Sequence, residues 1–472
     1  MGKYKRLLSN TAILGAGTFI SKVLVFLLMP LYTALLSTEQ FGSADILTQT
    51  ANLLIPLASL GISDGLFRFA LDSDSQKRKE VFGSAIGVFL AGMPMLAIFI
   101  QLLRFFGIYD GYLTLIFFYV CSANIHLICA NYLRACDRTK AFALQGIANT
   151  VLTILLNLLF LVVLDMGVLG YVLSVAVSDL LITVVVFFLC GLYREVRINL
   201  RNKELIASML RFSIPYIITT LMWMITSSSD RFIVAAFAGT SENGLYAAAY
   251  KLPTLISLAG GVFIEAWQFS SVNDAKPEER AKFFGDVYRN YMGIMFMGAS
   301  ALVAFAKLLS IMLLDDAYYS SWQYVPVLSI AMIFSAFSAF MGSVYFLEKK
   351  SLRSFVTAGI GALTNIVLNF IFIPFFGAMG AAVATVISYI VAFVIRACDT
   401  GKYLRFDLCW FRLIVNTLLI AAQTVLMLLE PPYWFAWQGI FAAVILAFNG
   451  KEIAQTVVQT AKKFLGKKRK NI

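Results

Sequence analysis

The stretch "LRFSIPYIITTLMWMITSSSDRFIVAAFAG" (residues 210–239) is apolar over more than the width of a lipid bilayer, yet it carries an acid beside a base, Asp230 and Arg231. About 20 apolar residues in a helix cross the hydrocarbon core of a membrane. A charge at the centre of such a helix costs roughly 2.5–3.5 kcal/mol on the insertion scale. The stretch therefore predicts a transmembrane helix whose charged residues have a function.

The rest of the chain is also strongly apolar. Of its 472 residues, 60% are hydrophobic and 14% are charged, whereas soluble domains are roughly 45–50% apolar and about 25% charged. We expect an all-α polytopic membrane protein with about fourteen transmembrane helices. Their expected limits are 9–36, 43–71, 81–103, 112–134, 141–164, 169–193, 206–238, 243–272, 286–309, 321–347, 353–376, 379–399, 408–429 and 433–449.

Lysine and arginine gather on every second loop. The basic loops include residues 77–79, 134–140, 194–203 and 349–353, and the loops between them are nearly free of positive charge. Cytoplasmic loops carry the excess of Lys and Arg, so we expect an even number of spans with both termini in the cytoplasm. The net charge of +12 is thus explained by topology, and because it is spread along the chain it does not indicate nucleic-acid binding.

Short segments recur about 200 residues apart. The matching pairs are "LSTEQFGSA" (36–44) with "AGTSENGLY" (238–246), "GIANTVLTILLN" (146–157) with "GIGALTNIVLN" (359–369), and "DMGVLGYVLSVAVS" (165–178) with "FGAMGAAVATVIS" (376–388). We expect two six-helix repeats of the same orientation, residues 1–200 and 201–405, then two extra helices in 406–450 and a basic tail, 451–472. In carriers built from parallel repeats, the substrate binds near the membrane midplane between the repeats.

Most charges embedded in apolar stretches lie in four spans, the first two of each repeat. They are Lys22, Asp64, Arg68, Asp230, Arg231, Lys251 and Glu265. Charged residues inside membranes face a cavity or one another rather than lipid. The repeat would bring the four spans together, so we expect a shared polar cavity lined by these residues.

Their individual roles stay open in part. Asp64 and Arg68 are spaced to form a local ion pair, and Arg68 lies where its side chain can reach the interface. We expect Asp230 to fix a helix–helix contact and Arg231 to face the cavity. Lys251, like Lys22, has no acid within four residues on its own helix, which favours a binding role for both lysines.

Other polar residues are expected to be structural. Glu265 aligns with Asp64 across the repeat, which indicates a shared role in ion coupling or in structure. Asp179 is interpreted as a hydrogen-bonding group, and His126 is the only histidine in the chain. One histidine and scattered cysteines do not make a metal site. We expect no catalytic residues, no metal and no cofactor.

Three segments carry a more specific resemblance. They are "LSNTAILGAGTFISKVLVFLLMPLYTALLSTEQFG" (8–42), "NYLRACDRTKAFALQGI" (131–147) and "SSSDRFIVAAFAGTSENGLYAAAYKLP" (227–253). They resemble the polysaccharide transport family, the Wzx-type flippases of the multidrug/oligosaccharidyl-lipid/polysaccharide exporter superfamily. The similarity extends over essentially the whole chain.

The resemblance implies a flippase of the bacterial cytoplasmic (inner) membrane. Such proteins move undecaprenyl-pyrophosphate-linked oligosaccharide repeat units to the outer leaflet by alternating access, for the biosynthesis of cell-surface polysaccharide. It further implies that Lys22, Arg231 and Lys251 face the pyrophosphate and that the two last helices contact the polyprenyl tail. We also expect Arg68 to be a substrate-binding residue. A polysaccharide polymerase or glycosyltransferases would be its protein partners.

Two other transport functions and an enzymatic function are the alternatives. A lipid II flippase is the main alternative, and a drug/cation antiporter of the same superfamily is another, although its cavity would be acidic. A membrane-embedded enzyme is disfavoured, because the sequence has no Gly-rich phosphate loop and no nucleophile–base arrangement. Arg and Lys suit a pyrophosphate, since both donate to phosphate oxygens.

The energy source is not encoded in a motif, and no ATP-binding loop is present. A lipid pyrophosphate carries about two negative charges, which would gain roughly 4–5 kcal/mol in leaving a cytoplasm at −100 mV. We therefore expect the membrane potential alone to drive export. A proton or Na⁺ site at Asp64 and Glu265 is the competing hypothesis.

Overall fold

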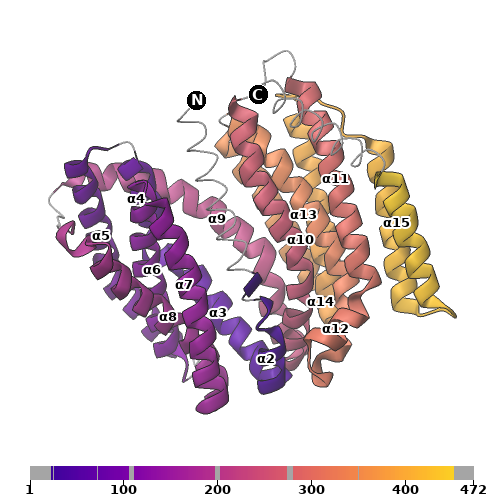
Figure 1. Cartoon of the computed structure of the whole chain (residues 1–472), viewed down its shortest axis with the longest axis horizontal. Coiled ribbons are helices and arrows are strands. Elements are labelled where there is room, and N and C mark those ends of the chain that lie inside the picture. Colours follow the sequence, from indigo (N-terminus) through magenta and orange to yellow (C-terminus); the bar gives the residue numbers. More distant parts are fainter. Residues whose placement is uncertain are drawn as a thin grey trace, which may run out of the picture. The chain divides into compact units, whose positions relative to one another are not determined.

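The computed structural model describes residues 23–24, 26–71, 73–105, 111–196, 202–273, 280–348 and 350–450. In these ranges every regular element is a helix (Figure 1). Nine helices of the described ranges are long and apolar enough to cross a membrane, or up to eleven if each of two bent pairs forms one span. The prediction of an all-α polytopic membrane protein is confirmed. The first expected span, 9–36, lies mostly outside the described residues, so the count of fourteen stays a prediction.

The chain divides into two compact units, unit 1 (Met1–Gly244) and unit 2 (Leu245–Ile472). Unit 1 holds α2 (Met29–Leu35), α3 (Thr38–Ala58), α4 (Ile62–Leu71), α5 (Ser75–Phe105), α6 (Leu113–Ala135), α7 (Thr139–Asn157), η1 (Leu158–Val163), α8 (Gly167–Leu189), η2 (Leu192–Arg194) and α9 (Lys203–Ala238). The helix α10 (Thr240–Asn273) begins in unit 1, and its part from Leu245 onward belongs to unit 2. Unit 2 further holds α11 (Arg280–Ala304), α12 (Ala306–Leu313), η3 (Asp316–Gln323), α13 (Tyr324–Leu347), α14 (Ser351–Thr400) and α15 (Trp410–Leu429).

Each unit is built around one buried helix. In unit 1, α6 packs against α3, α4, α5, α7 and α8, and in unit 2, α13 packs against α11, α14, α15 and η3 (Figure 1). Both helices are the fourth of their predicted repeat. The predicted boundary at residue 200 nevertheless differs from the division into units, because α9 packs against α3, α4 and α5 and so lies in unit 1. The repeat boundaries themselves stay a prediction.

The span expected over 43–71 is not one straight helix. It breaks between α3 and α4, whose axes differ by 52°. Leu60 and Gly61 have φ angles of 49° and 59°, in the left-handed region that a continuing helix excludes. A Cβ on Gly61 would lie 2.5 Å from the Ile217 side chain of α9. Close packing on α9 thus fixes the bend and places Asp64 in the first turn of a new helix.

The span expected over 286–309 is also broken. It consists of α11 and α12, which meet at Phe305 with a bend of 65°. Similarly, the loop expected between the spans 206–238 and 243–272 is shorter than predicted, because α10 already begins at Thr240. The sequence pattern placed these apolar stretches correctly but did not show where their axes change direction.

The spans expected over 353–376 and 379–399 are confirmed as a hairpin within α14. Gly377, with φ 55° and ψ −140°, is not helical. The chain reverses there, since Asn365 Nδ2 donates to Thr385 Oγ1 at 3.2 Å across the hairpin. Such backbone angles are tolerated essentially by glycine alone.

The predicted equivalent hairpin in unit 1 has the same local geometry. Its turn carries Gly167 with φ 51°, matching Gly377. Three residues later, Gly170 and Gly380 each approach the preceding helix so closely that a Cβ would lie 3.1 Å and 2.6 Å, respectively, from one of its carbonyl oxygens. This agreement supports the sequence repeat at these segments.

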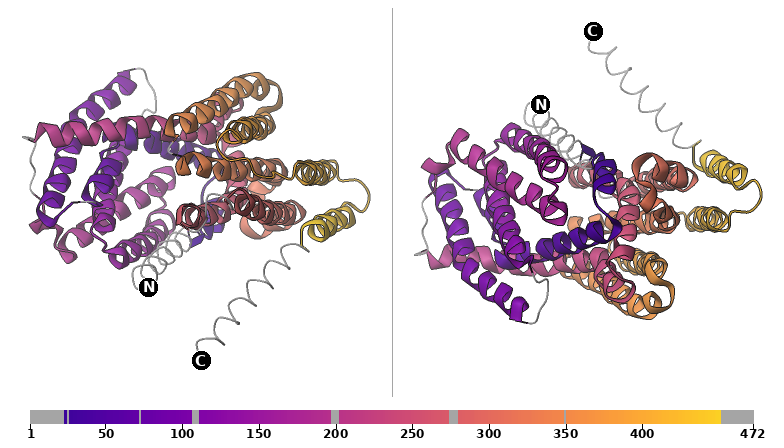
Figure 2. Two further views of the ribbon diagram at one scale, coloured as in Figure 1. Left: turned by 90° about the horizontal axis from the view of Figure 1, so that it is seen from above. Right: turned by 90° about the horizontal axis from the view of Figure 1, so that it is seen from below.

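The two C-terminal helices are α15 and a shorter apolar helix, Trp434–Gly450. They lie at one edge of unit 2 (Figure 2). Polar contacts attach α15 to its neighbours: Ser300 of α11 donates to Gln423 Oε1 at 2.8 Å, and Asn416 exchanges hydrogen bonds with Asn449 at 3.1 and 2.8 Å. The side chains on the other faces are apolar and exposed, as expected for helices in lipid.

Candidate functional site

The embedded arginine of α9 forms a buried ion pair in unit 1. Arg231 Nη1 donates to Asp45 Oδ1 of α3, and their side chains are only 6% and 5% exposed. The second carboxylate oxygen of Asp45, Oδ2, has no hydrogen-bond partner among the described residues. A charge pair taken out of water in this way is stable only while both partners remain in place.

An aromatic cluster includes a tyrosine close to this pair. Tyr171 of α8 lies within electrostatic reach of both Asp45 and Arg231. Its ring contacts Tyr32 edge-to-face, with centroids 4.7 Å apart, and Phe41 in the same manner at 6.0 Å. Both charges are buried, and buried charges need charged or hydrogen-bonding partners for their neutralisation.

The roles expected of the two neighbouring charges in α9 stay predictions. Within unit 1, Arg231 makes a helix–helix contact through Asp45. Asp230 is fully buried, and its Oδ1 accepts a hydrogen bond from the Arg231 backbone N–H at 2.9 Å. The sequence analysis did not single out Asp45, because this residue lies in the polar segment "FGSADILTQT" (41–50). Its position inside the expected span 43–71 is the signal that could have revealed it.

The other predicted site residues of unit 1 lie on α4. Asp64 is half-buried in the first turn and Arg68 is exposed in the last turn. The acid therefore lies at the positive end of the helix dipole and the base at its negative end, which stabilises a short helix. Gly65 lies beside Asp64, and a Cβ there would lie 2.5 Å from Ser213 Oγ of α9. This packing holds α4 against α9.

The remaining predicted residues belong elsewhere. Lys251 is half-buried in the part of α10 that belongs to unit 2. Glu265 lies further along α10, and Lys22 lies outside the described residues. Whether these three share a cavity with Arg231 stays a prediction.

A second polar cluster lies in the middle of unit 1. His126 Nδ1 of α6 lies 3.0 Å from Asp179 Oδ1 of α8, with side chains 13% and 14% exposed. Asn149 Nδ2 of α7 donates to the same oxygen at 2.8 Å, and the Ser178 hydroxyl bonds to Asn149. The interpretation of Asp179 as a hydrogen-bonding group is confirmed, and His126 is its partner. No group of His, Cys, Asp and Glu in the described part of the chain could hold a metal ion.

The segment 131–147, which contributed to the family resemblance, contains the connection between α6 and α7 and is attached by an ion pair to the residue that follows η2. Arg138 Nη2 donates to Glu195 Oε1 at 2.8 Å, and Tyr132 donates to Glu195 Oε2 at 2.5 Å. Burial lowers the pKa of Arg138, but the hydrogen bond and charge of Glu195 outweigh it and raise the pKa above its ordinary value. These contacts fix the loop to the end of α8.

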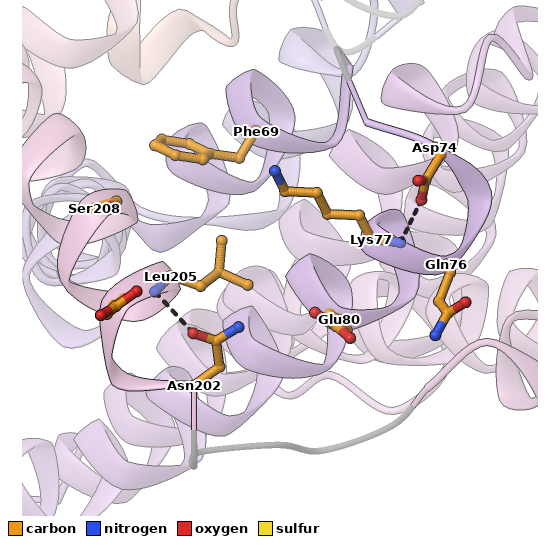
Figure 3. Close-up of a pocket in the computed structure, with 9 residues that line it drawn as sticks. Phe69, Asp74, Gln76, Lys77, Glu80, Asn202, Leu205 and Ser208 are labelled. Carbon is orange, nitrogen blue, oxygen red and sulfur yellow. Dashed lines mark hydrogen bonds between the residues drawn. The ribbon is translucent and has the colours of Figure 1, made fainter.

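A cavity of about 470 Å³ opens where α4, α5 and α9 meet at a basic-loop end of unit 1 (Figure 3). Its charged lining consists of Asp74, Lys77, Glu80 and Glu204. Asp74 Oδ1 accepts from the Lys77 backbone N–H at 2.8 Å, and so it caps α5. The excess of carboxylates would repel a pyrophosphate, so this cavity does not suit the expected anion.

Lys307 connects the N-terminal end of α12 with the C-terminal helices. Its Nζ lies 2.6 Å from Glu430 Oε1 and is positioned over the rings of Trp322 and Trp434, at 4.4 and 4.5 Å from their centroids. Cation–π contacts of this kind stabilise a partly desolvated ammonium. This lysine is thus an embedded cation with a structural explanation, and it provides a control for the residues of α9 and α10.

Comparison with solved structures agrees with the described fold. The lipid II flippase MurJ in an inward closed conformation matches with a TM-score of 0.72 and 14% identity, over 95% of this chain and 100% of that chain. An inward-facing multidrug resistance MATE family transporter of the MOP superfamily matches with a TM-score of 0.66 and 17% identity, over 81% and 95%. An outward-facing MATE structure gives 0.60 and 16%, over 84% and 95%. At these identities the likeness establishes the fold.

A search of curated proteins found no match by sequence. The neighbours by fold include a lipid flippase and multidrug transporters. Residues 7–267, more than half of the chain, match the polysaccharide biosynthesis protein family. The resemblance seen in the sequence is therefore confirmed: this chain belongs to the polysaccharide biosynthesis protein family.

Proposed function

We propose that this protein is a flippase that translocates undecaprenyl-pyrophosphate-linked oligosaccharide repeat units from the cytoplasmic to the outer leaflet by alternating access. Membership of the polysaccharide biosynthesis family and the fold shared with a lipid flippase support the proposal. The protein would act in the bacterial cytoplasmic membrane with both termini inside. A polysaccharide polymerase or glycosyltransferases would work beside it.

The observation that carries the proposal is the buried Arg231–Asp45 pair. An arginine offers a planar fork of donors that matches two phosphate oxygens. In the absence of substrate, Asp45 neutralises it. A pyrophosphate would replace Asp45 as its counter-ion, and this exchange requires α3 and α9 to separate. Anion binding would thereby be coupled to helix movement, which alternating access needs.

The other embedded cations would complete the anion site. Lys22, Lys251 and Arg68 would contact the remaining pyrophosphate oxygens, with Asp64, Asp230 and Glu265 as structural or ion-coupling groups. The helices of residues 406–450 would contact the polyprenyl tail, since their outer faces are apolar and exposed. No catalytic residue is needed, because flipping breaks no covalent bond.

Two alternatives to the proposed substrate follow from the likeness in fold. A lipid II flippase is favoured by the likeness to MurJ, and a drug/cation antiporter by the likeness to MATE transporters. A basic residue buried in α9 suits an anionic substrate and disfavours a cationic drug.

Complementation of a bacterial strain that lacks its oligosaccharide flippase tests the proposal. Arg231→Ala and Lys251→Ala should abolish surface polysaccharide while the protein remains in the membrane. Lys307→Ala, which removes an embedded cation outside the predicted site, is the matched control and should retain function. Normal polysaccharide in both site variants would contradict the assignment of these cations.

A further inference from the structure

An apolar pocket opens in unit 1 over the central helix α6, between α5 and α8. Its volume is about 270 Å³, and the helices on both sides of it pack against α6 (Figure 1). Apolar cavities of roughly 150 Å³ already bind benzene, so this pocket has room for a segment of a hydrocarbon chain. Its lining consists of Ile86, Phe89 and Leu90 of α5, Ile125, Ile128 and Cys129 of α6, Phe187 of α8, and Val196, which follows η2.

The pocket is bordered by apolar side chains that lipid would cover. Leu90 is 43% exposed, and Phe188 and Leu189, which follow the pocket along α8, are 62% and 82% exposed. Exposed apolar side chains of membrane-spanning helices lie against acyl chains, which are as apolar as they are. The pocket can therefore be filled from the surrounding bilayer.

The depth of the pocket corresponds to one leaflet. Ile125 lies ten residues before Ala135, the last residue of α6, which is about 15 Å along the helix axis. Val196 lies beyond the end of α8. The hydrocarbon core of a bilayer is about 30 Å thick. The pocket thus extends from the end of the helices through about half of this core, as one acyl chain does.

Arginines gather where the pocket ends, at Val196. Glu195, the residue before it, forms an ion pair with Arg138 at 2.8 Å. Arg78, near the start of α5, lies within electrostatic reach of Cys136, and so do Arg138 and Glu195. Glu195 neutralises only one of these two arginines.

Arg194 adds a further cation two residues before Val196. Its guanidinium lies over the ring of Tyr193, at 5.2 Å from the centroid, and its side chain is exposed. In the described part of the chain, this side chain has no acidic partner and makes no hydrogen bond. Phosphate oxygens are preferred acceptors for such a guanidinium. The charged side chains at this end are Arg78, Arg138 and Arg194 against Asp137 and Glu195, so its net charge is positive.

We propose that unit 1 binds an anionic phospholipid of the surrounding membrane, with an acyl chain in this pocket and the headgroup phosphate at Arg194. The apolar pocket and the basic end complement the two parts of such a lipid. A zwitterionic phospholipid has the same acyl chains but no net charge, and it binds less tightly. The bound lipid contacts α5, α6 and α8 together, and it stabilises the folded protein as any ligand of the folded state does.

The proposed lipid is distinct from the substrate of the proposed function, on which this inference does not depend. A polyprenyl chain is much longer than an acyl chain, whereas the pocket reaches through about one leaflet. Neither Arg231 nor Asp45 lines the pocket.

Photolabelling locates the lipid directly. The probe is phosphatidylglycerol with a diazirine in one acyl chain, added to nanodiscs of phosphatidylcholine that hold the full-length protein. Peptides that cover residues 86–90 and 125–129 should be labelled, as detected by mass spectrometry, and a phosphatidylcholine probe with the same chain should label them less. Arg194→Gln should weaken phosphatidylglycerol binding about fivefold, the effect of one basic residue near anionic lipid. Arg104→Gln, which removes an exposed arginine at the other end of α5, should leave the labelling unchanged.

A second pair of variants tests the pocket itself. Leu90→Trp fills part of the space for the acyl chain and should reduce labelling of residues 125–129. Leu102→Trp, at a position 49% exposed on the same helix but outside the pocket, is the matched control. Phosphatidylglycerol should also raise the unfolding temperature in detergent of wild type and Leu102→Trp more than that of Leu90→Trp or Arg194→Gln.

Three results would overturn the proposal. Equal labelling by the two probes, or by phosphatidylglycerol in wild type and Arg194→Gln, would show that the headgroup is not recognised. Labelling that Leu90→Trp and Leu102→Trp leave alike would show that the chain does not enter the pocket. Displacement of the probe by an equal amount of undecaprenyl phosphate would assign the pocket to the polyprenyl carrier instead.

Discussion

Removing one partner of the Arg231–Asp45 pair should destabilise the protein more than removing both. Each side chain is at most 6% exposed, so Asp45→Asn leaves a buried cation without its counter-ion, and Arg231→Met leaves a buried carboxylate. Breaking such a pair costs about 3–5 kcal/mol. The equilibrium between folded and unfolded protein should therefore shift roughly 100-fold or more in each single variant.

The double variant Asp45→Asn/Arg231→Met removes both charges. Replacing a buried ion pair by neutral groups of similar size is often close to neutral. The double variant should consequently be more stable than either single variant, and the double-mutant cycle should give a coupling free energy of several kcal/mol, well above the ~0.5 kcal/mol within which independent sites add.

Equilibrium unfolding in detergent, followed by circular dichroism and by the fluorescence of the native tryptophans, provides the free energies. A parallel cycle on Lys307 and Glu430 gives a reference, since Glu430 is 44% exposed and an exposed partner contributes less. If the effects of Asp45→Asn and Arg231→Met are each below ~1 kcal/mol and additive, the pair is not the buried contact described here and the exchange mechanism loses its basis.

The remaining predictions concern topology, backbone, the second unit and energy. Ser241→Cys, exposed at the start of α10, should react with an impermeant thiol reagent from outside intact cells; reaction only after permeabilisation would reverse the orientation. Gly377→Ala should destabilise the α14 hairpin by about 1–3 kcal/mol, because the φ of 55° with ψ −140° at this position strains any residue with a Cβ. Gly359→Ala, which places no atom within 4 Å of the added Cβ, should leave the stability unchanged. Equal stability of the two variants would contradict the backbone requirement at Gly377. Lys251→Arg should retain part of the flipping activity that Lys251→Ala loses, as measured in membranes with matched protein levels, and equal loss in both would show that a positive charge at this position is not sufficient. A valinomycin-imposed potential without a pH or Na⁺ gradient should accelerate flipping in proteoliposomes, and indifference to the potential would rule out an electrical drive.

The sequence predicted most of the fold because lipid imposes strong rules. Long apolar stretches and alternating basic loops indicated the spans, and the recurrence of Gly377 at Gly167 indicated the repeat that the two hairpins support. The bend at Gly61 was not predicted, since its cause is the close approach of Ile217 from another helix. Contacts over a long sequence separation leave no periodic signal.

The candidate site was predicted only in part. Arg231 was recognised by the cost of its charge in lipid, but its partner is 186 residues away, and a single sequence does not show which acid meets which base. His126 was assigned a structural role because one histidine makes no metal site. Its contact with Asp179 depends on the packing of α6 on α8, which spacing along the chain does not reveal.

Reconstituted flipping tests the central claim most directly. Purified protein in proteoliposomes should move an undecaprenyl-pyrophosphate-linked oligosaccharide between leaflets, as detected by its accessibility to a membrane-impermeant glycosidase. Lys307→Ala should do the same, and the Arg231→Met/Asp45→Asn variant, which keeps the fold without the cation, should not. If wild type leaves this lipid in place but moves lipid II or a cationic drug, or if the double variant flips as fast as wild type, the proposed function is contradicted.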